Sequence, residues 1–156
     1  MSVTVKRQIY TSCDINVAAG QVWARISDHE NTSSWVKDVK KVTLAKMGSP
    51  KNGVGAERIT VFRPILWSTI YERITFFDEP REFHTVLYKG MPGVVSHLTK
   101  FIVDDLGEDR CRLRWEVDFE FVSFHPFALT DSFSRQFKGI LDAALQNFKL
   151  QVESKG

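Results

Sequence analysis

The segment Arg112–Phe121, RLRWEVDFEF, alternates strictly between charged and apolar residues. The apolar positions are Leu113, Trp115, Val117, Phe119 and Phe121. The charged positions are Arg112, Arg114, Glu116, Asp118 and Glu120. Successive side chains of a strand point to opposite faces, so this period of two predicts a strand with one dry and one wet face. An antiparallel sheet that packs one face on a core accounts for the pattern.

Six further segments predict strands of the same sheet. They are Val3–Cys13, Val39–Ala45, Ala56–Phe62, Trp67–Phe77, Glu82–Tyr88 and Val95–Val103. Turn residues separate the later ones, as at Gly48-Ser49-Pro50 and at Gly90-Met91-Pro92-Gly93. Close spacing with tight turns favours an antiparallel meander.

Three segments have helical patterns. The first is Val17–Ser27, with Asn16 as its expected N-cap, and a shorter helix capped by Asn31 should contain Trp35. The C-terminal helix carries one apolar stripe, formed by Phe133, Phe137, Ile140, Leu141, Ala144, Leu145, Phe148 and Val152. Because a curved sheet must cover its dry face, we expect this long helix to lie against it. A cavity between the two is the default ligand site of such a domain.

The composition is that of an ordinary globular protein, with 156 residues, 43% hydrophobic and 26% charged. This length predicts a single domain over residues 1–156. The net charge is +2 and the basic residues are scattered, so no nucleic-acid partner is expected. Two isolated cysteines, no basic-then-apolar leader and no apolar run of about 18 residues predict a soluble, cytoplasmic protein without a membrane span.

Motifs for metals, cofactors and nucleophilic catalysis are missing from the sequence. The four histidines are widely separated and lack zinc-site spacing, so no metal is expected. Gly53-Val54-Gly55 precedes a strand and not a helix, which argues against a phosphate loop and leaves no cofactor to predict. His84 and His97 are candidates for proton transfer. His29 and His125 are expected at the surface.

Glu72 interrupts an apolar strand face that also carries Ile70, Ile74 and Phe76. A carboxylate there is costly to bury unless it has a partner. Arg58 on the preceding strand is the natural partner, if the face that carries Phe62 points inward. The pair could be structural, Glu72 could bind a ligand, or it could act as a general base with its pKa raised by burial.

Several segments in order resemble the START/Bet v 1-like superfamily (SRPBCC), and within it the polyketide cyclase/dehydrase and lipid-transport family. They are AAGQVWARISDHENTSSW (Ala18–Trp35), GVGAERITV (Gly53–Val61), YERITFFDEPREF (Tyr71–Phe83), LRWEVDFEF (Leu113–Phe121) and the terminal helix. The resemblance implies an α+β helix-grip fold. In that fold a curved seven-stranded antiparallel sheet wraps around a long C-terminal helix, with two short helices after the first strand.

The resemblance also implies a hydrophobic pocket between sheet and helix, because family members bind sterols, lipids, polyketides, plant hormones and quinones. The plant abscisic acid receptors have a Ser-x-Glu-Arg strand pattern that resembles Ile70–Arg73, which implies that Glu72 faces the cavity and Arg73 faces out. The expected ligand-binding residues are Arg58, Thr60, Phe62, Ile70, Glu72, Ile74, Val86, Tyr88, Phe101, Trp115, Val117, Phe119, Phe133, Phe137 and Leu141.

The leading hypothesis is a protein that binds a mostly apolar small molecule: a lipid, polyketide, quinone or aromatic metabolite. The alternative is a polyketide cyclase/aromatase or dehydratase, in which Glu72, His84 or His97 would move a proton. A protein–protein module is a third class, and the charged outer face of Arg112–Glu120 counts against it. We expect a monomer or a homodimer.

Overall fold

The computed structural model describes residues 3–63, 69–125, 128 and 131–154. In chain order the elements are β1 (Thr4–Ile15), α1 (Ala19–Ile26), the 3₁₀-helix η1 (His29–Ser34), β2 (Val39–Lys46), β3 (Glu57–Phe62), β4 (Thr69–Asp78), β5 (Glu82–Lys89), β6 (Val94–Gly107), β7 (Arg110–Val122) and α2 (Asp131–Ser154). Trp67, Pro126 and most of the apolar loop Arg63–Trp67 lie outside the described residues.

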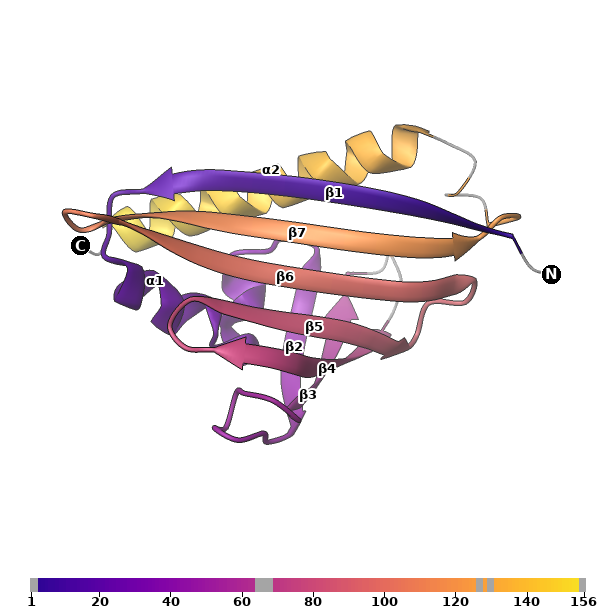
Figure 1. Ribbon diagram of the computed structural model, residues 1–156, viewed down its shortest axis with the longest axis horizontal. Helices are drawn as coiled ribbons and strands as arrows, with labels where there is room; N and C mark the ends of the chain where they lie inside the picture. Colours follow the sequence, from indigo (N-terminus) through magenta and orange to yellow (C-terminus); the bar gives the residue numbers. More distant parts are fainter. Residues whose placement is uncertain (1–2, 64–68, 126–127, 129–130, 155–156) are drawn as a thin grey trace.

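The strands form one antiparallel sheet in the order β1-β7-β6-β5-β4-β3-β2. β2 to β7 follow one another as a meander, whereas β1 pairs with β7, so α1 and η1 carry the chain from one sheet edge to the other. In Figure 1, α2 lies along β1, and β2 and β3 run steeply across the direction of β1 and β7. This curved sheet with its long helix confirms the predicted α+β helix-grip fold.

Buried side chains fill the space between the sheet and the helices in two clusters. One cluster includes side chains of α1, of the segment that follows η1 and of the C-terminal half of α2. Its largest members include Trp35, Phe83 and Phe148. The other lies at the N-terminal half of α2 and includes Phe119, Phe121 and Phe133. Tryptophan and phenylalanine rings meet edge-on in both clusters, a geometry that aromatic pairs favour.

The two short helices differ from expectation at their starts. α1 begins at Ala19 with Ala18 as its N-cap and no side-chain cap, and the backbone N–H of Asn16 donates to Glu153 instead. Asn31 lies inside η1, whose N-cap is Asp28, and Trp35 follows its last residue. Neither helix start has a side-chain cap hydrogen bond.

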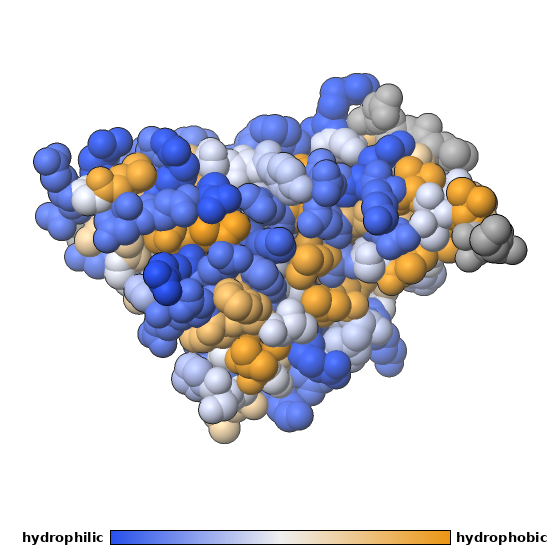
Figure 2. Space-filling model, viewed as in Figure 1, coloured by the Kyte–Doolittle hydropathy of each residue, from blue (hydrophilic) through white to orange (hydrophobic). Residues whose placement is uncertain are grey.

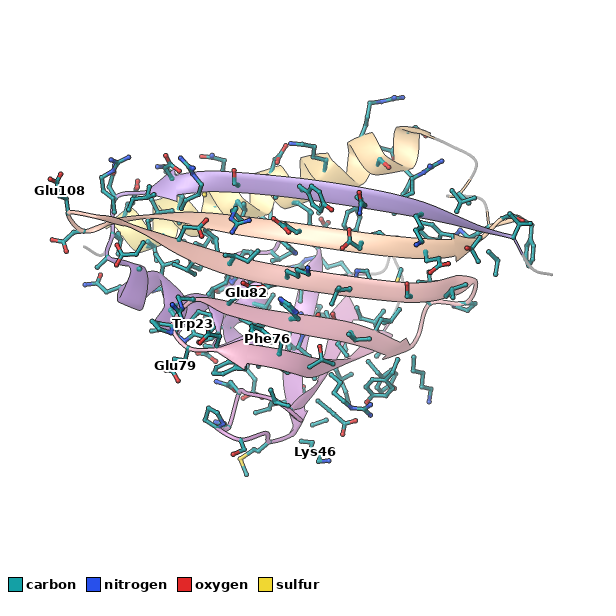
Figure 3. All side chains as sticks on the ribbon, in the orientation of Figure 1. Trp23, Lys46, Phe76, Glu79, Glu82 and Glu108 are labelled. Carbon is teal, nitrogen blue, oxygen red and sulfur yellow. The ribbon has the colours of Figure 1, made fainter. Side chains whose placement is uncertain are left out.

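A β-bulge changes which aromatic residue of β4 faces inward. The pairing with β5 shifts between Ile74 and Phe76, so Phe76 turns to the outer face and is 43% exposed. Phe77 faces the core and meets the ring of Trp23 at 5.3 Å. Figure 3 labels Phe76 and Trp23. The prediction that Phe76 shares the inner face with Ile74 is therefore wrong, because strict alternation ends at the bulge.

Figure 2 shows a face of the molecule that is mainly hydrophilic, with hydrophobic residues in smaller groups between the charged ones. On β7, Arg112 pairs with Asp14, and Arg114 pairs with Asp104 and Glu116. No helix among the described residues is long and apolar enough to cross a membrane.

Candidate ligand cavity

A cavity of about 240 Å³ lies between the inner face of the sheet and the N-terminal half of α2. Residues from β2, β3, β4, β6 and β7, from the turn after β5, from η1 and the segment after it, and from α2 line it, so the cavity exists only in the folded protein. The expected site residues that line it are Arg58, Thr60, Phe62, Ile70, Glu72, His97, Phe101, Trp115, Val117, Phe119, Phe133, Phe137 and Leu141. The remaining lining residues are Thr32, Val36, Asp38, Val39, Met91, Thr99, Ser132, Gln136 and Ile140.

The pairing of β3 with β4 brings Arg58 and Glu72 together. They are direct cross-strand partners, as are Thr60 and Ile70, so all four side chains share the inner face. Arg58 is 7% and Glu72 3% exposed. The next pair in this register, Glu57 with Arg73, faces outward, as the resemblance implied for Arg73.

Three side chains donate hydrogen bonds to the Glu72 carboxylate. Arg58 Nε donates to Oε1 at 3.1 Å, Thr60 Oγ1 donates to the same oxygen at 3.4 Å, and Thr85 Oγ1 donates to Oε2 at 2.9 Å. Burial opposes ionisation of Glu72, but the charge of Arg58 and these hydrogen bonds outweigh it and hold the pKa of the carboxyl group below its usual value. Glu72 is therefore an ionised, fully partnered carboxylate at neutral pH.

His29 joins this cluster, which corrects the expectation that it lies at the surface. It is fully buried, and its Nε2 lies 2.9 Å from the backbone oxygen of Asn52. That carbonyl only accepts, so Nε2 carries the proton and Nδ1 can accept from Arg58 Nη1 at 3.4 Å. Burial and the nearby Arg58 charge lower the pKa of His29 to about 4, so the ring is neutral.

His29 had no sequence signal of its own. It begins a 3₁₀-helix of six residues, which is too short to show a periodic pattern. Only the packing of η1 against the sheet places it under Phe83, with ring centroids 5.3 Å apart.

His97 lies on the cavity wall from β6 and is 7% exposed. Its ring stacks on Phe119 at 4.5 Å, and Nε2 lies 3.5 Å from Thr99 Oγ1. Burial lowers the pKa of His97, so it too is neutral at pH 7. Its Nδ1 has no hydrogen-bond partner within the described part of the chain, and neither has the indole N–H of Trp115. Both residues line the cavity.

Three expected site residues lie on the opposite face of β5 from the cavity. His84, Val86 and Tyr88 share one face of the strand, as predicted, but that face is the outer one. His84 hydrogen-bonds Glu82 and stacks on the exposed Phe76, and Tyr88 is 45% exposed. Their assignment to the cavity is wrong, because alternation shows which residues share a face but not which face turns inward.

Ile74 faces inward but does not line the cavity. It is 1% exposed and belongs to the core cluster around Trp35 and Phe83. In its place Met91, in the β5–β6 turn, borders the cavity and is buried.

Side chains that could hold a metal ion do not gather in the described residues, where no three of His, Cys, Asp or Glu come together. The arrangement is that of a mostly apolar cavity with a compact polar cluster at its wall. Arg58, Thr60, Glu72 and His97 line the cavity, whereas Thr85 and His29 contact the cluster without lining it.

Solved structures with the same fold are numerous. A START superfamily protein from Mycobacterium smegmatis matches with a TM-score of 0.79 and 15% identity, over 96% of this chain and 99% of that one. A norcoclaurine synthase from Thalictrum flavum, a point mutant in complex with a transition-state analogue, matches over the full length of both chains with a TM-score of 0.71 and 17% identity. An uncharacterised protein from Bacillus thuringiensis matches with a TM-score of 0.72 and 19% identity, over 94% of this chain and 98% of that one.

These identities show the fold alone, and no curated protein matches the sequence. The sequence itself matches the family model described as polyketide cyclase / dehydrase and lipid transport, over residues 6–153. That match spans nearly the whole chain. The protein therefore belongs to the polyketide cyclase/dehydrase and lipid transport family.

Proposed function

We propose that this protein binds a mostly apolar small molecule in the cavity between the sheet and α2. The observation that carries the proposal is the cavity itself, which is walled by aromatic and aliphatic side chains and has one buried polar cluster. Apolar walls with a few convergent polar groups are typical of ligand sites. Affinity would come from burial of rings and alkyl groups, and orientation from the polar cluster.

The size of the cavity supports a compact ligand. Sites for drug-sized molecules measure about 300–1,000 Å³, and this cavity of about 240 Å³ is smaller. A molecule of one or two rings, or a short acyl chain, fits this volume better than a sterol or a phospholipid. Norcoclaurine synthase, which shares the fold, has been solved in complex with dopamine and hydroxybenzaldehyde, two single-ring compounds.

The first test is native mass spectrometry of the protein purified from its own host, followed by denaturation and identification of any released compound. The expected result is one bound species of compact, mostly apolar structure. Val117→Phe should abolish this occupancy, since Val117 is buried on the cavity wall and a larger ring fills the space. Val95→Phe is the matched control, because Val95 is 55% exposed on β6.

Overpacking at Val117 costs about 1–3 kcal/mol, so both variants need a thermal melt to show that they are folded. A folded Val117→Phe variant that retains the compound as well as the wild type would contradict a site in this cavity.

The alternative is that the protein acts as a cyclase/aromatase or dehydratase on a ligand in the same cavity. The observation that favours it is His97, a neutral, buried imidazole on the wall whose Nδ1 has no partner among the described residues. Such a group can take or give a proton near neutral pH. Incubation of the identified ligand with the wild type and with His97→Gln tests it: turnover by the wild type that is lost in the variant supports the enzyme, and no turnover leaves the carrier.

The cellular location, the oligomeric state and the use of cofactors or partners stay predictions from the sequence. We expect a cytoplasmic protein, monomeric or homodimeric, that uses no metal or cofactor and has no nucleic-acid partner.

A further inference from the structure

We infer that the cavity selects an electrically neutral, compact molecule with a hydrogen-bond acceptor such as a carbonyl oxygen, and discriminates against the carboxylate of the same shape. This inference rests on the proposed function and names the chemical class of its ligand. Three features of the cavity carry it: the balance of charge on the wall, the hydrogen-bonding group left open to a ligand, and the apolar remainder.

The charge balance disfavours an anion. Arg58 is the single basic residue among the described residues that line the cavity, whereas Glu72 and Asp38 are both acidic. Arg58 is already neutralised by Glu72 at 3.1 Å. A ligand carboxylate near Arg58 would place a second negative charge beside Glu72 in a site shielded from water, where like charges repel strongly.

The neighbouring histidines do not offset that repulsion. His29 and His97 are neutral at pH 7, so neither supplies the positive charge that a second carboxylate would need. A neutral carbonyl adds no net charge and avoids the repulsion.

Within the Arg58–Glu72 pair, the group that remains open to a ligand is a donor. Both carboxylate oxygens of Glu72 already accept hydrogen bonds within the protein. Arg58 uses Nε toward Glu72 and Nη1 toward His29, which leaves Nη2 without a hydrogen-bond partner in the described chain. Because the Arg58 side chain borders the cavity, a ligand oxygen that accepts from Nη2 completes the cluster.

The remainder of the lining is mostly aromatic and aliphatic. Phe101, Phe119, Phe133 and Phe137 approach the cavity from β6, β7 and α2. These rings offer the ligand body mainly apolar contacts, and the volume of about 240 Å³ favours a molecule of about two fused rings. A flat aromatic ketone, aldehyde or quinone meets all three conditions.

Two probes of nearly equal shape test the inference: 2-acetylnaphthalene, a neutral ketone, and 2-naphthoate, its carboxylate counterpart. Isothermal titration of the wild type at pH 7.5 should show that the ketone binds about tenfold or more tightly than the carboxylate. Equal or tighter binding of 2-naphthoate would overturn the inference and leave the proposed function standing. Binding of neither probe, with no compound released in native mass spectrometry, would overturn the proposed function itself.

The variant Glu72→Gln provides a second test of the inference. The amide keeps the shape of the side chain but removes its negative charge, so Arg58 becomes free to pair with an anion. The variant should bind 2-naphthoate about tenfold more tightly than the wild type, so the preference for the ketone over the carboxylate should largely disappear. Unchanged binding of the carboxylate by a folded variant would contradict the role given to Glu72.

Asp38→Asn keeps the charge argument testable if Glu72→Gln does not fold. Asp38 is only half-buried, so its substitution should leave the fold intact. Loss of its charge should improve 2-naphthoate binding to a smaller degree than Glu72→Gln does and shift the ratio of the two affinities toward the carboxylate. No improvement with 2-naphthoate would count against an electrostatic origin of the selectivity.

Discussion

A double-mutant cycle on Arg58 and Glu72 tests whether the buried pair acts as a unit. Glu72→Leu leaves the Arg58 charge buried without its partner, and Arg58→Met leaves Glu72 in the same condition. Breaking a buried ion pair from one side costs about 3–5 kcal/mol of the free energy of unfolding. We expect each single variant to lose an amount in this range.

The double variant should lose no more than either single one. It contains no buried charge at the pair, and its remaining cost comes from the partners left behind, the hydroxyls of Thr60 and Thr85 and Nδ1 of His29. At roughly 1 kcal/mol each these sum to about 3 kcal/mol. With each single variant at about 3–5 kcal/mol, the coupling energy is then about 3–7 kcal/mol, measurable by urea unfolding monitored by tryptophan fluorescence.

The neighbouring register position supplies the control. Glu57 and Arg73 pair across the same two strands at 3.0 Å, but Arg73 is half exposed and solvent screens the interaction. The same cycle at this outer pair should give a coupling energy within error of zero. If the losses at Arg58 and Glu72 simply add, or if the outer pair couples as strongly, then burial is not what makes the inner pair cooperative, and the reasoning fails.

Three further predictions concern stability. His29 has a pKa near 6.5 in the unfolded chain and about 4 in the folded protein, so the free energy of unfolding should fall by about 3 kcal/mol as the pH drops through this window. Urea titrations at pH 4.5 and 7 should show that His29→Gln removes this part of the pH dependence. Gly139→Ala should raise stability by about 0.5–1 kcal/mol, because a Cβ at this position of α2 meets nothing within 4 Å. Gly90→Ala should lower stability, because Gly90 has φ +115° and a Cβ would lie 2.5 Å from the Thr69 oxygen; melting temperatures that shift in the same direction for both variants would contradict this. Phe83→Ala should lower the free energy of unfolding by about 3–5 kcal/mol, since Phe83 is fully buried, whereas Phe124 is 81% exposed and Phe124→Ala should change it by less than about 0.5 kcal/mol. Similar losses for the two variants in chemical unfolding would refute the placement of Phe83 in the core.

Local patterns were enough to predict most of the fold. The alternation in Arg112–Phe121 and the apolar stripe of the last helix required only the two periods of strand and helix, and both elements form as expected. The pairing of Arg58 with Glu72 was also predictable, because a carboxylate on an apolar strand face requires a partner and the adjacent strand offered one.

Other parts of the site depend on contacts that no local pattern contains. The inner face of β5 carries Phe83 and Thr85 and not His84, since curvature and strand order decide which face meets the helix. A bulge in β4 turned Phe76 outward, and a bulge inserts its extra residue without a strong sequence signature.

The elements, their order and the need for a partner beside Glu72 follow from local sequence patterns, because periodicity and the cost of burying charge act through near neighbours. The presence of His29 in the cluster, the position of His97 but not His84 on the cavity wall, and the open volume of about 240 Å³ follow only from the packing of the folded chain. Those outcomes depend on how η1 and α2 pack against a curved sheet. Packing of that kind depends on residues far apart in the chain, and no single segment encodes it.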